Sequence, residues 1–347
     1  MLRQAFYWIG CLLLVAGVWS AEPAVANTPS VPVLSSGPQQ AQLGAYIRDI
    51  HHLDIKANTV QIDVLLWMIQ PATLKDDNPF EHFEITNAQH VERDAGEQFV
   101  LPNGDRLYSE SFDITASQNY DLSTYPMDAQ VLELQFEDTM RDKQQFVFTL
   151  DERNLQLREA ISLSGWKLLT PSLRERTRSH FGGTRVVRHR ARQLQQEEAG
   201  DATLQPVAYS QVVLSMPIQR IGRGYFFKLF SAVFLASAVA FLCFLIQPSS
   251  LEARLSLGVG ALFAVVASNF VLSSMLPETH LVTLGEQIVN LSYGAIYAVI
   301  LESAVAFKYG ETGHGRAALR LDRCCGIGMP LLYVSGIAWM LHAAHVF

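Results

Sequence analysis

Hydrophobic positions change their spacing partway along the chain. In the first part they alternate with polar positions, most clearly over 58–68, 106–116 and 130–137. A period of two residues predicts strands that bury one face. Turn signals such as Pro-Asn-Gly-Asp at 102–105 separate these runs. We therefore expect an antiparallel β-sandwich within residues 27–219.

The last part of the chain carries long apolar stretches instead. They span 225–247, 255–276, 284–307 and 324–347. Each is long enough to cross a hydrocarbon core of roughly 30 Å, which requires about 20 residues. The expected fold class is therefore a β-sandwich followed by a four-helix transmembrane bundle over residues 220–347.

The predicted sandwich and the connection between the last two apolar stretches are expected on opposite sides of a membrane. Arg3, an apolar run to Trp19 and the small residues at 24–26 are typical of a secretory signal over residues 1–26; an uncleaved anchor helix is the alternative. The connection between the third and fourth stretches carries Lys308, Arg316, Arg320 and Arg323. Because basic connections stay in the cytoplasm, we expect a multi-pass protein of a bacterial inner (plasma) membrane, with the sandwich in the periplasm.

Composition excludes several functions. The net charge is -7 and 17% of residues are charged, which argues against nucleic acid as a partner. No catalytic motif, phosphate loop or paired metal spacing occurs, so we expect neither an enzyme nor a cofactor. His51-His52 and His342/His345 are expected to be ordinary histidines rather than zinc ligands. The predicted sandwich has no cysteine, so its core must form without disulfides.

The second apolar stretch differs from the others in one stripe at helical spacing. That stripe contains Glu252, Ser256, Gly260, Phe263, Ala267, Phe270 and Ser274. It is small and polar at both ends and aromatic in the middle. Such a stripe fits a helix that lines a gated water path. A small-residue packing face inside a helix bundle explains it about as well.

Several motifs carry a family resemblance over nearly all of the chain after the signal. They are Tyr125-Pro-Met-Asp128, Gly165-Trp166, Arg220 and Arg223 before Tyr225-Phe226, the gap-free run from Glu252 to Pro277, and Glu302. Together they resemble the prokaryotic pentameric ligand-gated ion channels, the branch of the Cys-loop receptor superfamily that lacks the Cys-loop disulfide.

The resemblance implies a homopentamer in membrane lipid, with five second helices around a pore. The implied pore and selectivity residues are Glu252, Ser256 and Gly260, and the implied gate is Phe263, Ala267 and Phe270. A ring of carboxylates would favour monovalent cations. Arg254 would oppose that field, but it lies about 200° around the helix from Glu252, so both cannot face the pore.

The same resemblance places coupling and ligand binding in the sandwich. The implied coupling residues are Asp54, Asp128, Arg220, Arg223 and Pro277, and the choice between the two arginines as key partner stays open. The implied ligand site lies between neighbouring sandwiches and involves Trp67, Tyr108, Glu137 and Tyr209.

The stimulus is expected to be a small ligand or protons, because carboxylates are plentiful outside the membrane. Some family features are absent, including a proline in the first helix and a histidine at position 265. A membrane-anchored ligand sensor or binding protein that does not conduct is the alternative function.

Overall fold

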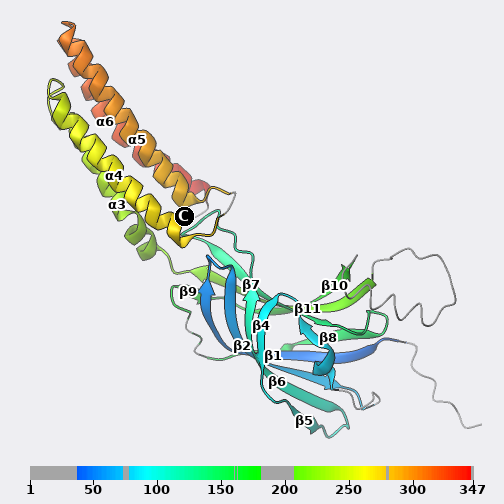
Figure 1. The fold of residues 1–347 in the computed structure, drawn as a ribbon. Coiled ribbons are helices and arrows are strands. Elements are labelled where there is room, and N and C mark those ends of the chain that lie inside the picture. Colours follow the sequence, from blue (N-terminus) through cyan, green and yellow to red (C-terminus); the bar gives the residue numbers. More distant parts are fainter. Residues whose placement is uncertain are drawn as a thin grey trace, which may run out of the picture. The chain divides into compact units, whose positions relative to one another are not determined.

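The computed structural model describes residues 37–72, 78–159, 161, 163–180, 207–278 and 281–344, apart from the side chains of 151–154 and 223. The expected signal over 1–26 and the polar segment 182–206 lie outside the described residues. Strands make up the first part of the described chain and long helices the second (Figure 1). This order is the predicted one.

The first sheet has six strands in the order β4-β6-β2-β1-β8, with β5 paired to β6. Its strands are β1 (Gln39–Asp54), β2 (Thr59–Gln70), β4 (Ala88–Arg93), β5 (Glu97–Val100), β6 (Arg106–Ser117) and β8 (Phe146–Leu157). Buried and half-buried residues alternate along β2 and β6, as the hydrophobic period predicts. The β1–β8 pair is parallel, whereas the other pairs of this sheet are antiparallel.

The second sheet has five strands in the order β10-β11-β7-β3, with β9 paired to β11. Its strands are β3 (Phe83–Ile85), β7 (Ala129–Asp138), β9 (Trp166–Leu168), β10 (Ser172–His180) and β11 (Val207–Arg220), and a short 3-10 helix η1 (Pro79–His82) precedes β3. A cluster of aromatic rings joins the two sheets. Phe83 on β3 lies 6.0 Å from Phe112 on β6 and 5.3 Å from Phe136 on β7, measured between ring centroids.

The helices are α3 (Arg223–Phe241), the 3-10 turn η2 (Leu242–Leu245), α4 (Leu251–Met275), α5 (Leu284–Glu311) and α6 (Gly315–Ala343). Four helical segments are long and apolar enough to cross a membrane. Thr283 begins α5 with a capping box: its hydroxyl accepts from the Glu286 amide at 3.2 Å, and the Glu286 carboxylate accepts from the Thr283 amide at 2.8 Å. Both exchanges satisfy amides that a helix start leaves unpaired.

Helices α4 and α6 begin several residues before their expected starts. α4 begins at Leu251 rather than at residue 255, and α6 begins at Gly315 rather than at residue 324. The difference in α6 arises because its first turns carry Arg316 and Arg320, both exposed, which broke the apolar pattern without breaking the helix. A hydropathy pattern locates the membrane-crossing part of a helix and misses its polar extension.

A buried hydroxyl holds α6 against two other helices. The Tyr333 hydroxyl on α6 lies 3.1 Å from the Ser237 hydroxyl on α3 and 2.8 Å from the Ser292 hydroxyl on α5. Large apolar residues elsewhere on α6 are exposed, including Leu332 and Trp339. Polar ties of this kind are typical of helix packing in membranes, where lipid tails compete for apolar surfaces.

Candidate functional site

The two faces of α4 differ in burial within the chain. The buried residues are Arg254, Gly258, Ala261, Val265 and Leu272. The stripe of small, polar and aromatic residues lies on the opposite face, and all of its members from Glu252 to Ser274 are exposed. Phe263 is 70% exposed and Phe270 is 76% exposed, which is unusual for two rings on one helix face. The rest of the chain therefore does not cover the residues predicted to form a gate.

An open groove follows the first half of this exposed face. It has a volume of about 1300 Å³ and is lined by Glu252, Ser256, Gly260 and Phe263, with Phe307 of α5 at its edge. The groove is therefore lined by the predicted selectivity residues and the first predicted gate residue.

Two glycines show how differently the faces of α4 are packed. A Cβ at Gly258 would lie 2.6 Å from a side-chain carbon of Ile300, whereas a Cβ at Gly260 would meet nothing within 4 Å. Gly258 therefore permits close contact between α4 and α5. Gly260 borders open space.

At the sandwich end of the helices, Arg220 and Asp128 form a buried ion pair. The Arg220 Nε donates to Asp128 Oδ1 at 2.7 Å, and its Nη2 donates to Oδ2 at 3.4 Å. The Gln130 amide donates to the same carboxylate at 2.7 Å. The Asp128 side chain is fully buried and that of Arg220 is 10% exposed. Arg220 is thus the partner of Asp128 in the structure, and the side chain of Arg223 lies outside the described part.

Three aromatic rings surround the Arg220 guanidinium. Its central carbon lies 4.1 Å from the Trp166 ring centroid, 5.1 Å from that of Tyr125 and 5.5 Å from that of Tyr225. Such cation–π contacts strengthen when water is excluded. Burial and the hydrogen bond with Tyr225 raise the pKa of Tyr125, so its hydroxyl stays protonated. The sequence motifs named Trp166 and Tyr125, but not their contact with Arg220.

Side-chain contacts continue from this cluster onto α3 and α4. The Tyr125 and Tyr225 hydroxyls lie 2.9 Å apart, and the Tyr225 hydroxyl lies 3.8 Å from the sulfur of Met275. Lys56, in the β1–β2 turn, donates its Nζ to the Ser274 carbonyl at 3.1 Å. The end of the exposed stripe of α4 is therefore bonded directly to a sandwich turn.

Backbone bonds tie the start of α5 to the same sandwich loop. The Leu284 amide donates to the Ser123 carbonyl at 2.9 Å, and the Gly285 amide donates to the Tyr125 carbonyl at 3.0 Å. These amides belong to the first helical turn, where the helix itself offers no acceptor.

A cavity of about 420 Å³ lies among these groups, lined by His52, Leu53, Asp54, Ile55, Lys56, Tyr125, Arg220, Tyr225 and Met275. Asp54, a predicted coupling residue, lines it, and its carboxylate accepts from the Ala57 amide at 2.9 Å, which shapes the turn. Pro277, also predicted for coupling, is half-buried just after α4. The structure thus brings Asp54, Asp128 and Arg220 into one region.

The four predicted ligand residues divide between the two sheets. Glu137 on β7 is fully buried; its carboxylate accepts from the Gln211 amide at 2.7 Å and lies 3.0 Å from His180 Nε2. The His180 ring stands edge-on to Tyr209 at 5.4 Å. Burial, aided by the positive charge of Arg178, lowers the pKa of His180. Sequence reasoning missed His180 and Gln211, although Gln211 is the register partner of Glu137.

Trp67 and Tyr108 lie on β2 and β6 of the first sheet instead. Tyr108 is 4% exposed. The Trp67 ring covers Gly44 of β1 so closely that a Cβ there would lie 2.3 Å from the ring. Within one chain these two aromatics therefore belong to a different sheet from Glu137 and Tyr209.

Three carboxylates that the sequence did not single out lie side by side on the first sheet. Asp63 on β2 is the register partner of Asp49 on β1 and of Asp113 on β6. Burial raises the pKa of Asp63, and Arg48, whose Nη1 lies 3.7 Å from the Asp63 carboxylate, opposes this rise. The negative charges of Asp113 and Asp49 raise the pKa of Asp63 further. Like charges directly opposite across strands destabilise a sheet. This row therefore gains stability when it takes up a proton.

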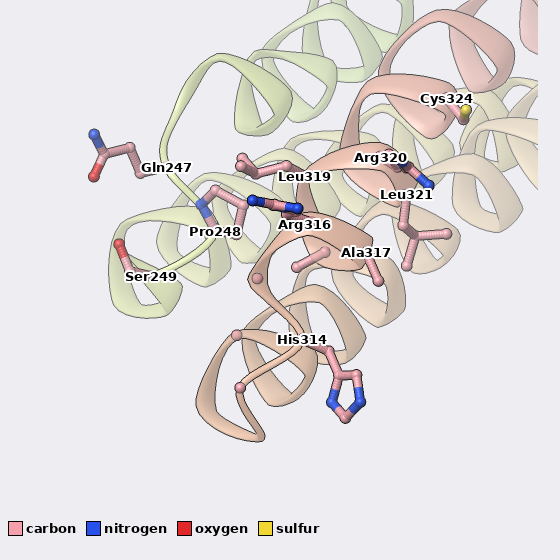
Figure 2. Close-up of a pocket in the computed structure, with 14 residues that line it drawn as sticks. Gln247, Pro248, Ser249, His314, Arg316, Ala317, Leu319, Arg320, Leu321 and Cys324 are labelled. Carbon is pink, nitrogen blue, oxygen red and sulfur yellow. The ribbon is translucent and has the colours of Figure 1, made fainter.

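The far end of the helices holds a second groove (Figure 2). It has a volume of about 1240 Å³ and lies between the α3–α4 connection, at Gln247–Ser249, and the first turns of α6. Arg316 and Arg320 line it from the same face of α6, four residues apart.

Among the described residues, no group of three or more His, Cys, Asp or Glu is placed to bind a metal.

Comparison with known proteins shows a distant similarity that covers most of the chain. No family model matches the chain. A proton-gated ion channel of Gloeobacter violaceus is 20% identical to it over 356 aligned residues, which cover 96% of this chain and 90% of that protein. The similarity therefore extends through both the sandwich and the helices.

Proposed function

We propose that the chain is the subunit of a homopentameric ligand-gated ion channel that conducts monovalent cations across a bacterial inner membrane, with the sandwich in the periplasm. The observation that carries this proposal is the exposed face of α4. Seven residues of mixed character, from Glu252 to Ser274, lie on one side of a membrane helix and are left uncovered by their own protomer.

That face suits neither lipid nor a finished protein core. Phe263 and Phe270 alone would be stable against lipid tails. Glu252, Ser256 and Ser274 share their face, and charged or polar groups on membrane helices usually face a bundle interior or water. In a closed ring of identical copies, the exposed faces of the α4 helices would all point toward the central axis. The aromatic middle then forms a constriction that excludes water, and the ring of Glu252 attracts cations.

Protons are the stimulus that the comparison favours, since the relative is named a proton-gated channel. A small ligand bound near Glu137 and Tyr209, beside Trp67 and Tyr108 of a neighbouring copy, is the other stimulus. In either case the Asp128–Arg220 pair and the Lys56–Ser274 contact would pass the change to α4. A carboxylate–arginine cluster can be bistable, because its stability depends on its geometry and on the access of water, and a gated element requires two such arrangements.

A non-conducting ligand sensor is the alternative, because a sandwich above a helix bundle would serve it equally well. The two functions differ at Phe263. In a channel, removing a ring from the constriction lets water and ions pass. In a sensor, the same change alters packing alone.

Purified protein in liposomes separates these functions. Cation and anion flux is measured at neutral and acidic external pH for the wild type, for Phe263→Ala and for Phe227→Ala. Phe227 on α3 is 64% exposed and lies outside the α4 stripe, so it is the matched control. We expect acid to increase wild-type cation flux, and Phe263→Ala alone to increase flux at neutral pH. Equal behaviour of the two variants would refute the pore assignment, and a monodisperse monomer or dimer in mild detergent would refute the pentamer.

A further inference from the structure

The first turn of α4 contains a buried arginine, Arg254, that contacts three other segments. Arg254 is 1% exposed, although it lies two residues from the exposed Glu252. Its Nη1 is 2.6 Å from Asp322 Oδ1 of α6 and 3.5 Å from Glu302 Oε2 of α5. Its Nε donates at 3.2 Å to the carbonyl of Ile246, the first residue of the connection between η2 and α4. One side chain therefore links α4 to each of the other helices or their connections.

The charges in this cluster do not cancel one for one. One guanidinium faces two carboxyl groups, so its positive charge is fully balanced whenever either carboxyl is ionised. The side chains of Glu302 and Asp322 are only 3% and 9% exposed. Buried charges weaken little with salt and act on their surroundings over a longer range than exposed ones. The net charge of the cluster at the N-terminal end of α4 is therefore zero or negative, and never positive, while either carboxyl group is ionised.

We propose that Glu302 and Asp322, which lie on α5 and α6 rather than on the α4 stripe, determine the charge selectivity of the pore by holding and cancelling Arg254. This inference rests on the proposed channel function and extends it to residues away from the stripe. With Arg254 held, Glu252 is the charge that an ion meets at this mouth.

The consequence of losing the carboxyl groups follows from the position of Arg254. Its side chain is long enough to reach an exposed surface while its stem stays buried. Uncancelled, five arginines beside five Glu252 residues remove the negative potential that concentrates cations. Salt screens exposed charges over a Debye length of about 8 Å, so the effect of one freed charge is small and the sum over five copies is what matters.

The test is the ratio of cation to anion permeability, obtained from reversal potentials in a salt gradient. The double variant Glu302→Gln/Asp322→Asn keeps the size of both side chains. We expect it to reduce the ratio about tenfold, as charge summed over five copies at this range allows. Adding Arg254→Gln to the double variant is expected to restore the ratio. Glu311→Gln, an exposed carboxylate on the same helix α5, is the control and is expected to leave the ratio unchanged.

The outcomes separate this inference from the channel itself. A cation-selective wild type whose ratio is unchanged in the double variant overturns the inference and leaves the channel standing. The same holds if Arg254→Gln fails to restore a lowered ratio. A wild type that passes no ions under any condition overturns the channel and the inference together.

A second measurement needs no conduction and covers variants that are too unstable to record. Thermal unfolding is followed for Arg254→Gln, Glu302→Gln and their combination. Residues in contact give non-additive changes, so the combined loss in Tm is expected to be smaller than the sum of the single losses. Additive losses would show that Glu302 does not hold Arg254, and would overturn the inference.

Discussion

Replacing Arg220 by glutamine tests how the sandwich is joined to the helices. The change leaves the Asp128 carboxylate fully buried, with only the Gln130 amide as a strong remaining donor among the contacts described above. Removing one partner of a buried ion pair costs about 3–5 kcal/mol, because the other charge stays desolvated. Loss of the cation–π contacts adds about 0.5–2 kcal/mol. The retained Gln130 bond offsets part of this, so the expected loss is about 4 kcal/mol.

The assay is thermal unfolding of the protein in detergent, followed by tryptophan fluorescence. Trp166 is well placed as a reporter, since the guanidinium lies 4.1 Å from its ring centroid. A loss of this size corresponds to a fall in Tm on the order of 10 °C. Arg220→Lys keeps the positive charge but loses the two-point hydrogen bonding to the carboxylate and the stacking of a planar guanidinium on the rings. Its Tm should therefore lie between those of the wild type and Arg220→Gln. Arg176→Gln, on the exposed side of β10, should leave Tm unchanged.

A double variant decides whether the unpaired, buried Asp128 carboxylate causes the fall in Tm. Arg220→Gln/Asp128→Asn removes both charges, so no buried charge is left unpaired, and replacing both partners costs far less than removing one. We expect its Tm to lie above that of Arg220→Gln. If the double variant is as unstable as the single, or if Arg220→Gln melts with the wild type, the reasoning from burial is refuted.

Three further predictions concern the row of carboxylates, the faces of α4 and the attachment of α6. Because the pKa of Asp63 is raised, this residue stabilises the fold fully below about pH 4, and the contribution is lost as pH rises. Asp63→Asn should therefore raise Tm at neutral pH and leave Tm unchanged in acid. The Ser123 amide lowers the pKa of Asp121, so Asp121→Asn should lower Tm at neutral pH instead. Gly258→Ala should cost about 1–3 kcal/mol in unfolding free energy, because its Cβ would lie 2.6 Å from an α5 side chain, whereas Gly260→Ala should not lower Tm. Tyr333→Phe should cost about 1 kcal/mol, seen as a small fall in Tm, because the two serine hydroxyls keep their own carbonyl acceptors.

Periodicity located most of the fold because each element is amphipathic or continuously apolar. The alternation over 58–68 corresponds to β2, and the apolar stretches correspond to the helices. The stripe on α4 was also visible from spacing alone, since residues on one helix face recur at fixed intervals. The start of α6 was not, because Arg316 and Arg320 are as compatible with a loop as with an exposed helical turn.

Partners across the fold were beyond the reach of spacing. Nothing along the chain indicates that Arg254 lies against Glu302 and Asp322, which are separated from it by whole helices. The parallel pairing of β1 with β8 is equally non-local. Arg220 and Arg223 differ little as sequence, and only the contact with Asp128 distinguishes Arg220. Such facts depend on tertiary packing, which local patterns do not encode.

The backbone bonds at the start of α5 limit how freely the two halves of the chain can be recombined with other proteins. The Leu284 and Gly285 amides use the Ser123 and Tyr125 carbonyls of the sandwich as their acceptors. A chimera that joins these helices to a foreign sandwich must supply two carbonyl groups at the same places, whatever its side chains. The workable exchange unit is therefore the helices together with the 123–125 loop, and a cut placed only by the order of domains along the chain would separate donors from acceptors.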